Sequence, residues 1–306
     1  MIVSAGLTPA WQQILRFTRL HVGQVNRAAE ARWCGSGKVL NVGAALATLK
    51  VPAVTLAPLG GLAYDAIDEE LAALGVERRW VRTDSATRTC TTVLDAASGV
   101  TTELVENATA LEPDELESFA VLFKQAAAHA SVVVLTGSLP EKTPVTFYRE
   151  LLETTSAQAL VDARGPELLA ALEAQPLVIK PNREELAKTF DFDSQDDAQI
   201  AEAVERLHDR GARWIVVTQG RGPVMIASPG ATEHVEPPTV EAVVNPIGCG
   251  DCLAAGIAWG LSEGRSVPEA VRLGMAAAAE NLGQLLPARL DRARVLARWA
   301  AMSRNA

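Results

Sequence analysis

The stretch from Ser131 to Gly220 alternates short runs of β-branched residues with segments in which apolar residues recur at helical spacing. The strand-like runs are SVVVLTG (131–137), ALVDARG (159–165), LVIKPN (177–182) and WIVVTQG (214–220), and the helical segments are PVTFYRELLETT (144–155), GPELLAALEAQ (165–175) and REELAKTF (183–190). Such alternation is typical of a parallel sheet with crossover helices. It predicts an α/β sandwich that binds its ligand at the C-terminal ends of the strands.

Two regions interrupt this alternation and read as strands, at about 12–33 and 78–106. In the second region, Ala97, Ser98 and Gly99 predict a hairpin turn. We therefore expect a small accessory β-sheet beside the main one, which could serve as a lid, as an edge cover or as a contact with a second copy. Because no proline-rich or low-complexity linker divides the chain, residues 1–306 are predicted to form a single domain.

Composition excludes several classes of protein. A chain of 306 residues can bury a full core, and it has no apolar run of the roughly 18 residues that a membrane-spanning helix needs. The opening MIVSAGLTPAWQQ does not resemble a secretion signal, and four scattered cysteines do not make a disulfide framework. We expect a cytoplasmic protein with no membrane partner. A formal charge of −9 argues against nucleic-acid binding.

The stretch VVNPIGCGDCLAAGIAWGL (243–261) combines glycines, two cysteines and a carboxylate at the predicted start of a helix. Cys249 and Cys252 have the C-x-x-C spacing of redox sites, but no second pair is present to complete a zinc site. A dinucleotide-binding loop would need glycine where Leu253 stands. A glycine-rich turn at a helix N-terminus remains, and it suits an anion such as a phosphoryl group in transfer.

The segment RWCGSGKV (32–39) is not a nucleotide-binding P-loop either. Arg32 replaces the first glycine of that motif, and Val39 replaces the Ser or Thr that would bind Mg²⁺. The chain therefore carries neither of the two standard nucleotide motifs.

Two polar features each have a structural and a functional interpretation. Asp251, in the first helical turn, could simply interact with the helix dipole, worth roughly 0.3–1 kcal/mol. It could also be a general base beside the phosphate site. Asn182 and Glu185 have the spacing of a capping box, but they could also hold Mg²⁺ through water.

Taken together and in order, GKVLNVGAALATL (37–49), LTGSLP (135–140), IKPNREE (179–185) and GCGD (248–251) resemble the ribokinase-like (PfkB) carbohydrate kinases, most closely the branch of 1-phosphofructokinase and tagatose-6-phosphate kinase. The resemblance runs over nearly the whole chain. It implies a three-layer α/β/α sandwich with a mostly parallel central sheet and a small β lid. It also implies ATP- and Mg²⁺-dependent phosphorylation of a hydroxyl on a sugar or sugar phosphate, and a homodimer formed through the lid.

The resemblance also implies site residues. Asp251 matches the family's catalytic base, and the backbone of Gly248, Cys249 and Gly250 matches its anion hole. The positions matching nucleotide-site residues are Lys180, Asn182, Glu185, Thr218, Gly220, Gly222 and Asn281, of which Asn182 and Glu185 match the Mg²⁺-linked pair. The positions matching substrate-binding residues are Gln12, Arg27, Gly37, Lys38, Asn41, Arg88 and Ser138. Lys38 and Arg88 could neutralise a substrate phosphate.

Several positions depart from the pattern of this branch. Gln12 stands where an aspartate commonly contacts sugar hydroxyls, Cys90 and Val105 replace asparagines, and D-T-S-G becomes Asp162-Ala163-Arg164-Gly165. Most departures fall on sugar recognition, whereas the phosphate machinery at 182–185 and 248–251 is kept. We therefore expect a working kinase with an altered acceptor pocket. A kinase for an unphosphorylated sugar or a nucleoside, and a non-catalytic nucleotide or sugar sensor, are the alternatives. Cys249 beside the anion hole also suggests sensitivity to oxidation.

Overall fold

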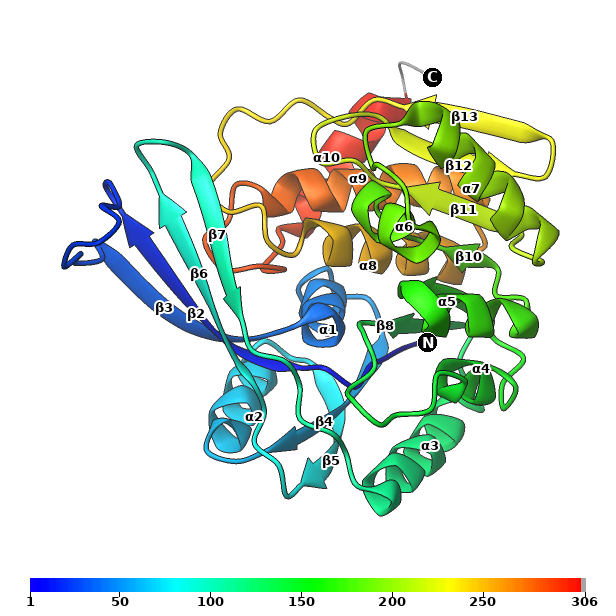
Figure 1. The fold of residues 1–306 in the computed structure, drawn as a ribbon, viewed down its shortest axis with the longest axis horizontal. Coiled ribbons are helices and arrows are strands. Elements are labelled where there is room, and N and C mark those ends of the chain that lie inside the picture. The colour runs from blue at the N-terminus through cyan, green and yellow to red at the C-terminus, as the bar shows by residue number, and fades with distance from the viewer. Residues whose placement is uncertain (304–306) are drawn as a thin grey trace.

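The computed structural model describes residues 1–303, and its centre is a nine-stranded sheet in the order β13-β12-β11-β10-β9-β8-β1-β4-β5 (Figure 1). The strands are β1 (Ile2–Ala5), β4 (Ala53–Gly60), β5 (Glu77–Thr83), β8 (Val132–Thr136), β9 (Gln158–Asp162), β10 (Val178–Ile179), β11 (Trp214–Val217), β12 (Val224–Ser228) and β13 (Ala231–Val235). Neighbours from β5 to β11 pair in parallel, and β12 and β13 are antiparallel. The predicted, mostly parallel sheet is confirmed.

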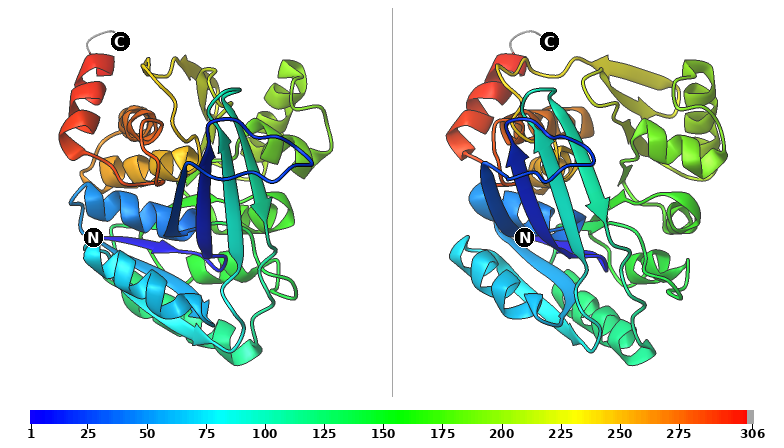
Figure 2. Two further views of the ribbon diagram at one scale, coloured as in Figure 1. Left: turned by 90° about the vertical axis from the view of Figure 1, so that its left-hand side faces the viewer. Right: turned by 60° about the vertical axis from the view of Figure 1, so that its left-hand side comes forward.

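Helices cover both faces of this sheet (Figures 1 and 2). One face carries α1 (Lys38–Thr48), α2 (Ala63–Ala73), α8 (Cys249–Ser262), α9 (Val267–Asn281) and α10 (Arg292–Ser303), and the other carries α3 (Pro113–Ala127), α4 (Phe147–Leu152), α5 (Gly165–Ala171), α6 (Arg183–Phe190) and α7 (Asp197–Asp209). Alternate residues of β8 enter the two cores, Val132 and Val134 on one side and Val133 and Leu135 on the other. A strand buried on both faces must be apolar throughout, which is why the sequence showed uninterrupted apolar runs.

A second, mixed sheet of four strands stands beside the sandwich (Figure 2). Its order is β3-β2-β6-β7, with β2 at Ala10–Phe17, β3 at Glu30–Ser36, β6 at Thr89–Asp95 and β7 at Val100–Val105. β6 and β7 form an antiparallel hairpin, and Gly99 in its turn has a φ of 70°. The predicted accessory sheet and its hairpin turn are confirmed.

The predicted boundaries of the accessory sheet need two corrections. Residues 77–83 form β5, which pairs with β4 at the edge of the main sheet rather than in the small one. An edge strand is buried on one side only, so its alternating polar pattern looks like that of an accessory strand. Residues 18–29 form a loop between β2 and β3 rather than a strand. Within residues 1–303, no helix is long and apolar enough to cross a bilayer.

Candidate active site

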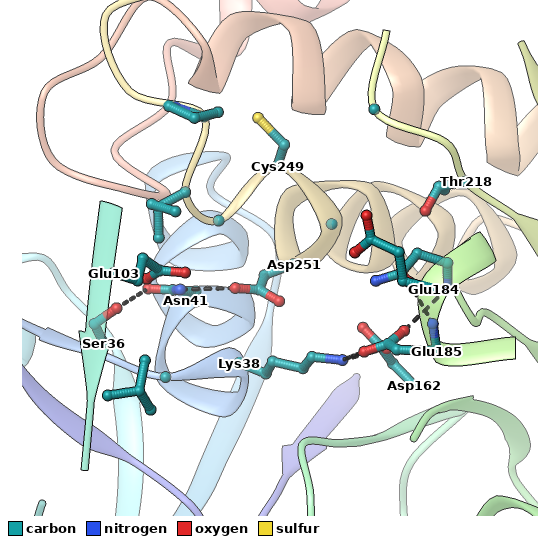
Figure 3. Close-up of a pocket in the computed structure, with 18 of the residues that line it drawn as sticks. Ser36, Lys38, Asn41, Glu103, Asp162, Glu184, Glu185, Thr218, Cys249 and Asp251 are labelled. Carbon is teal, nitrogen blue, oxygen red and sulfur yellow. Dashed lines mark hydrogen bonds and ion pairs between the residues drawn. The ribbon is translucent and has the colours of Figure 1, made fainter. Parts of the chain in front are cut away.

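A cavity of about 660 Å³ lies between the main sheet and the small one (Figure 3). Asp162 and Lys180 line it from the C-terminal ends of β9 and β10, and Thr218 from the end of β11. Lys38 and Cys249 line it from the first residues of α1 and α8. The cavity therefore lies at the sheet edge predicted from the strand pattern, and the N-termini of α1 and α8 adjoin it.

The glycine turn before α8 requires its first glycine. Gly248 is the N-cap with a φ of 84°, and a Cβ there would lie 2.8 Å from the Cβ of Pro287. A Cβ on Gly250 would lie 3.5 Å from the Nζ of Lys180, so the turn closely approaches a cation. The first N–H groups of a helix have no intrahelical acceptor. The turn therefore offers backbone donors and a nearby positive charge to an anion.

Asp251 is the buried carboxylate of this turn, with 7% of its surface exposed. The Nδ2 of Asn41 donates a hydrogen bond of 2.7 Å to Oδ2 of Asp251, and the Oγ of Ser36 donates one of 3.1 Å to Oδ1 of Asn41 (Figure 3). Burial and the negative charge of Asp162 raise the pKa of Asp251 to about 6, against the opposing effect of Lys38. Asp251 is thus oriented by its neighbours and able to take up a proton near neutral pH.

Asp162 joins two lysines at the cavity floor. Its side chain is fully buried, Oδ1 accepts a 2.8 Å hydrogen bond from the Nζ of Lys38, and Oδ2 lies 3.0 Å from the Nζ of Lys180. The Nζ of Lys38 also donates a 2.9 Å hydrogen bond to Glu185 (Figure 3). Burial alone would lower the pKa of Lys38, but the two carboxylates raise it above its usual range. Lys38, predicted to neutralise a substrate phosphate, is already neutralised by the protein.

Asn182 and Glu185 form the predicted capping box at the start of α6. The Glu185 N–H donates to Oδ1 of Asn182 over 2.8 Å, and the Asn182 N–H donates to Oε2 of Glu185 over 3.0 Å. Both residues also line the cavity. Within residues 1–303, no three His, Cys, Asp or Glu side chains are grouped to hold a metal directly. An amide and a carboxylate oxygen at the cavity wall fit Mg²⁺, which takes few protein ligands and keeps its waters.

The inner face of the small sheet forms the opposite wall. Strand pairing aligns Gln12 with Cys90 and Cys90 with Val105, and all three line the cavity together with Glu103. Nε2 of Gln12 donates a 2.8 Å hydrogen bond to the Oγ1 of Thr92. This wall therefore carries an amide, a carboxylate and uncharged side chains, and Gln12, Cys90 and Val105 are the positions at which the sequence departs from the branch.

Arg88 lines the cavity where the small sheet joins the sandwich, but its guanidinium is bonded to the backbone. Its Nη2 donates to the carbonyl of Thr8 over 3.0 Å, its Nη1 to that of Glu106 over 3.1 Å, and its Nε to that of Pro9 over 3.3 Å. Arg88 therefore links the segment just before β2 to the residue that follows β7.

Most residues predicted for the site are gathered in the cavity wall. They are Gln12, Gly37, Lys38, Asn41, Arg88, Lys180, Asn182, Glu185, Thr218, Gly220, Gly248, Cys249, Gly250 and Asp251. Four others are not in the wall. Arg27 is exposed in the loop between β2 and β3, Ser138 is half-buried after β8, Gly222 lies in the turn before β12, and Asn281 ends α9.

Asn281, which the resemblance placed near the nucleotide, is only 1% exposed and is occupied in holding the loop before α8. Its Nδ2 donates to the carbonyl of Ile247 over 2.8 Å, and its Oδ1 accepts from the N–H of Ala288 over 2.7 Å. These bonds give it a structural role in shaping the approach to the glycine turn.

Cys249 does not have the properties of a reactive thiol. Burial raises its pKa to about 11, despite a hydrogen bond from Asn281, and its Sγ lies 3.5 Å from the carbonyl of Ala278. The thiolate is the oxidisable form. This environment argues against the oxidation sensitivity expected from the sequence.

Several lining residues were not predicted as site residues. They are Ala10, Ser36, Cys90, Glu103, Val105, Asp162, Arg183, Glu184, Ser194, Gln195, Gln219, Pro246 and Ile247. A signal was available for Asp162, because it is the last residue of a buried strand, where parallel sheets place their ligand-binding residues. Glu103 gave no such signal, since only strand pairing shows which face of the small sheet it occupies.

The sandwich, the small mixed sheet and the cavity between them together define a ribokinase-like fold. A family model confirms the class, because the pfkB family carbohydrate kinase model matches residues 3–289. The chain belongs to this family and is a carbohydrate kinase.

Solved structures share the whole fold. Phosphofructokinase-2 from Escherichia coli, in its tetrameric inhibited form, superposes with a TM-score of 0.87 at 23% identity, over 99% of each chain. A possible 1-phosphofructokinase from Thermotoga maritima gives 0.87 at 18% identity, over 98% of each chain. Ribokinase from Thermotoga maritima gives 0.78 at 19% identity, over 98% of this chain and 99% of that one. At these identities the likeness concerns the fold.

Proposed function

We propose that this kinase transfers the γ-phosphoryl group of ATP to a hydroxyl of a sugar or sugar phosphate, with Asp251 as the general base. The observation that carries the proposal is the buried Asp251 carboxylate, held 2.7 Å from Asn41 in the first turn of α8. A base of this kind needs a pKa near the working pH, and that of Asp251 is raised to about 6. The resemblance to 1-phosphofructokinase and tagatose-6-phosphate kinase favours a hexose derivative as the acceptor.

Nucleotide binding is assigned to the wall formed by β10, β11 and α6. The residues proposed to contact MgATP are Lys180, Asn182, Glu185, Thr218 and Gly220, with Asn182 and Glu185 holding Mg²⁺ through water. When bound, Mg²⁺ would neutralise charge on the transferred phosphoryl group and orient it.

The protein's own part in the reaction is to move one proton and to stabilise one charge. Asp251 accepts the proton of the acceptor hydroxyl as its oxygen forms a bond to phosphorus and the bond to the ADP oxygen breaks. The N–H groups of the Gly248–Asp251 turn stabilise the negative charge that develops on the phosphoryl oxygens. The small sheet covers the acceptor and excludes water, which would otherwise compete as the nucleophile.

Acceptor-dependent ADP formation tests the function. Purified protein is incubated with MgATP and a panel of hexose phosphates, free sugars and nucleosides, with and without EDTA. ADP release that needs both an acceptor and Mg²⁺ supports a kinase. ATP binding with no turnover on any acceptor would instead support a sensor.

The reaction should lose rate in acid at a pH set by Asp251. Because its folded pKa is about 6, the base becomes protonated as the pH falls through 6, and kcat/KM should fall about tenfold per unit below that. An ordinary aspartate would keep its activity to about pH 4. The profile is measured from pH 4.5 to 8.5, with circular dichroism checking the fold at each pH. A rate that stays constant down to pH 4.5 would remove Asp251 from this role.

We also propose that a second copy of the chain packs on the outer face of the small sheet. Pairing places Trp33 and Leu104 on the side opposite the cavity-lining Gln12, and they are 43% and 60% exposed. Trp33 stacks on Trp11 with ring centroids 5.6 Å apart, which adds a pair of aromatic rings to this face.

Trp33→Glu should convert a dimer into a monomer, because it places a charge on the proposed interface. Light scattering coupled to size-exclusion chromatography at micromolar concentration measures the mass. Val121→Glu is the matched control, since Val121 is 50% exposed on α3 and far from this face. If the two variants have the same mass as the wild type, the small sheet is not the interface.

A further inference from the structure

The loop between α9 and α10, residues 282–291, contacts two walls of the cavity that lie far apart in the sequence. Pro287 of this loop is buried against the glycine turn, since a Cβ on Gly248 would lie 2.8 Å from the Cβ of Pro287. The leucines at 285–286 pack against a buried apolar cluster of the small sheet, which consists of Ile14, Cys34 and Leu94. The loop therefore touches both the small sheet and the glycine turn.

Arg289 fixes this loop with two nitrogens of its guanidinium. Its Nη1 donates a 2.7 Å hydrogen bond to the carbonyl of Pro287, and its Nη2 pairs with Oε1 of Glu70 on α2. The side chains of Arg289 and Glu70 are only 14% and 24% exposed. A charge-assisted bond that is shielded from water in this way is stronger than an ion pair on the open surface.

The second oxygen of Glu70 holds the edge strand of the small sheet. Within this sheet β3 pairs on one side only, with β2, so the N–H groups on its outer side have no strand partner. The N–H of Gly35 in β3 donates to Oε2 of Glu70 over 2.5 Å. Two residues further along, Gly37 is the N-cap of α1, which begins at Lys38. Glu70 therefore links the loop to the segment that leads from the small sheet to the cavity floor.

These contacts form a continuous path between two parts of the cavity wall. The path starts at the glycine turn and ends in the small sheet, and its members are Gly248, Pro287, Arg289, Glu70 and Gly35. In the proposed function, the turn stabilises the phosphoryl group while the small sheet covers the acceptor. Their relative position decides whether the acceptor hydroxyl is aligned for attack, and a misplacement of about 1 Å can lower the rate about 100-fold.

We infer that Glu70 and Arg289 are positioning residues, which hold the small sheet and the glycine turn in the arrangement that phosphoryl transfer requires. Both side chains lie outside the cavity wall, so they act through Gly35 and Pro287 rather than on the reacting atoms. The inference rests on the proposed phosphotransfer function and adds to it a pair of residues on α2 and in the loop before α10.

Breaking the pair admits water, and this gives a measurable signature. In the wild type, each ADP formed is matched by one phosphorylated acceptor. If water enters instead, its oxygen bonds to phosphorus as the bond to the ADP oxygen breaks, Asp251 accepts a proton from the water, and inorganic phosphate is released. The ratio of ADP to phosphorylated acceptor therefore reports whether the two walls are held together. A loss of folded protein does not change this ratio.

Glu70→Gln and Arg289→Met, singly and together, test the inference. An amide has one acceptor oxygen, so Glu70→Gln can satisfy Gly35 or Arg289 but not both. Each single variant should lower kcat about tenfold and raise the ratio of ADP to phosphorylated acceptor about twofold or more. The affinity for MgATP, measured by calorimetry, should change little. Because the two residues act as a unit, the double variant should be no worse than either single one.

Asp68→Asn is the matched control. Asp68 lies on the same helix as Glu70 and forms an ion pair of similar exposure with Arg78 of β5, away from the cavity. It should lower the midpoint of urea unfolding, as the other variants do, but leave kcat and the product ratio unchanged. The acceptors used are fructose, fructose 1-phosphate, fructose 6-phosphate, tagatose 6-phosphate and ribose, with kinetics on the best of them.

Each other outcome contradicts a defined part of the inference. Wild-type kcat and a wild-type product ratio in both Glu70→Gln and Arg289→Met overturn it and leave the proposed function standing. The same is true if Asp68→Asn shows equal changes, or if the two single effects multiply in the double variant, because the pair then contributes stability alone. A wild type that turns over none of the acceptors counts against both the inference and the proposed function.

Discussion

Asp251→Ala should lower kcat by about 100-fold or more, while the affinity for MgATP should change little. The loss follows from the geometry, because no other carboxylate is held in the first turn of α8. Nucleotide affinity should be retained, since Asp251 is proposed to act on the acceptor hydroxyl and the nucleotide contacts are proposed for α6 and the ends of β10 and β11. Steady-state kinetics at saturating acceptor, together with calorimetric titration of MgATP, measure the two quantities separately.

Stability provides the control for that variant. The folded pKa of Asp251 lies above the value of 3.8 for an unperturbed aspartate, so its charged form is disfavoured in the fold and reduces stability at neutral pH. Asp251→Asn, which keeps the size of the side chain, should therefore be at least as stable as the wild type in urea at pH 7.5 and still be inactive. Turnover above about a tenth of the wild-type rate in either variant would exclude Asp251 as the base.

The main sheet was predictable because its strands are buried on both faces. β8 and β9 read as apolar runs with no competing interpretation. β5 was misplaced because it is an edge strand, half exposed along its length, and exposure removes the signal on which such a prediction depends. Residues 18–29 connect the paired ends of β2 and β3 and lie outside the strand pairing, so they form a loop rather than a strand.

Site residues could likewise be predicted where their role depends on neighbouring residues in the sequence, but not where it depends on contacts with distant parts of the chain. Gly248 and Asp251, which line the cavity, could be proposed from the sequence because they belong to one turn of chain. The partners of Lys38 were not, because Asp162 and Glu185 lie 124 and 147 residues further along the sequence. From the sequence alone, Lys38 was therefore interpreted as a cation that could bind a substrate phosphate. Only the fold shows that its charge is paired with those of Asp162 and Glu185.

Asp162→Asn should destabilise the protein by about 3–5 kcal/mol, because it breaks a buried ion pair by removing one partner. Lys180 is 3% exposed, and it would lose the carboxylate that lies 3.0 Å from its ammonium group. Lys38 suffers less, since it retains Glu185. Urea unfolding at pH 7.5 measures the loss as a lower midpoint at an unchanged slope.

A second substitution distinguishes this electrostatic cause from a simple packing defect. Lys180→Met in the Asp162→Asn background removes the uncompensated charge and keeps the length of the side chain, so the double variant should regain most of the lost stability. The wild type carries a matching pH signature. Burial raises the pKa of Asp162, but Lys180 and Lys38 together lower it below its usual range, so the ion pair stabilises the fold above that range and the gain disappears as the pH falls through the folded pKa. If the stability losses of the single variants Asp162→Asn and Lys180→Met simply add in the double variant, the charges at the cavity floor are not coupled, and Asp162 contributes through packing alone.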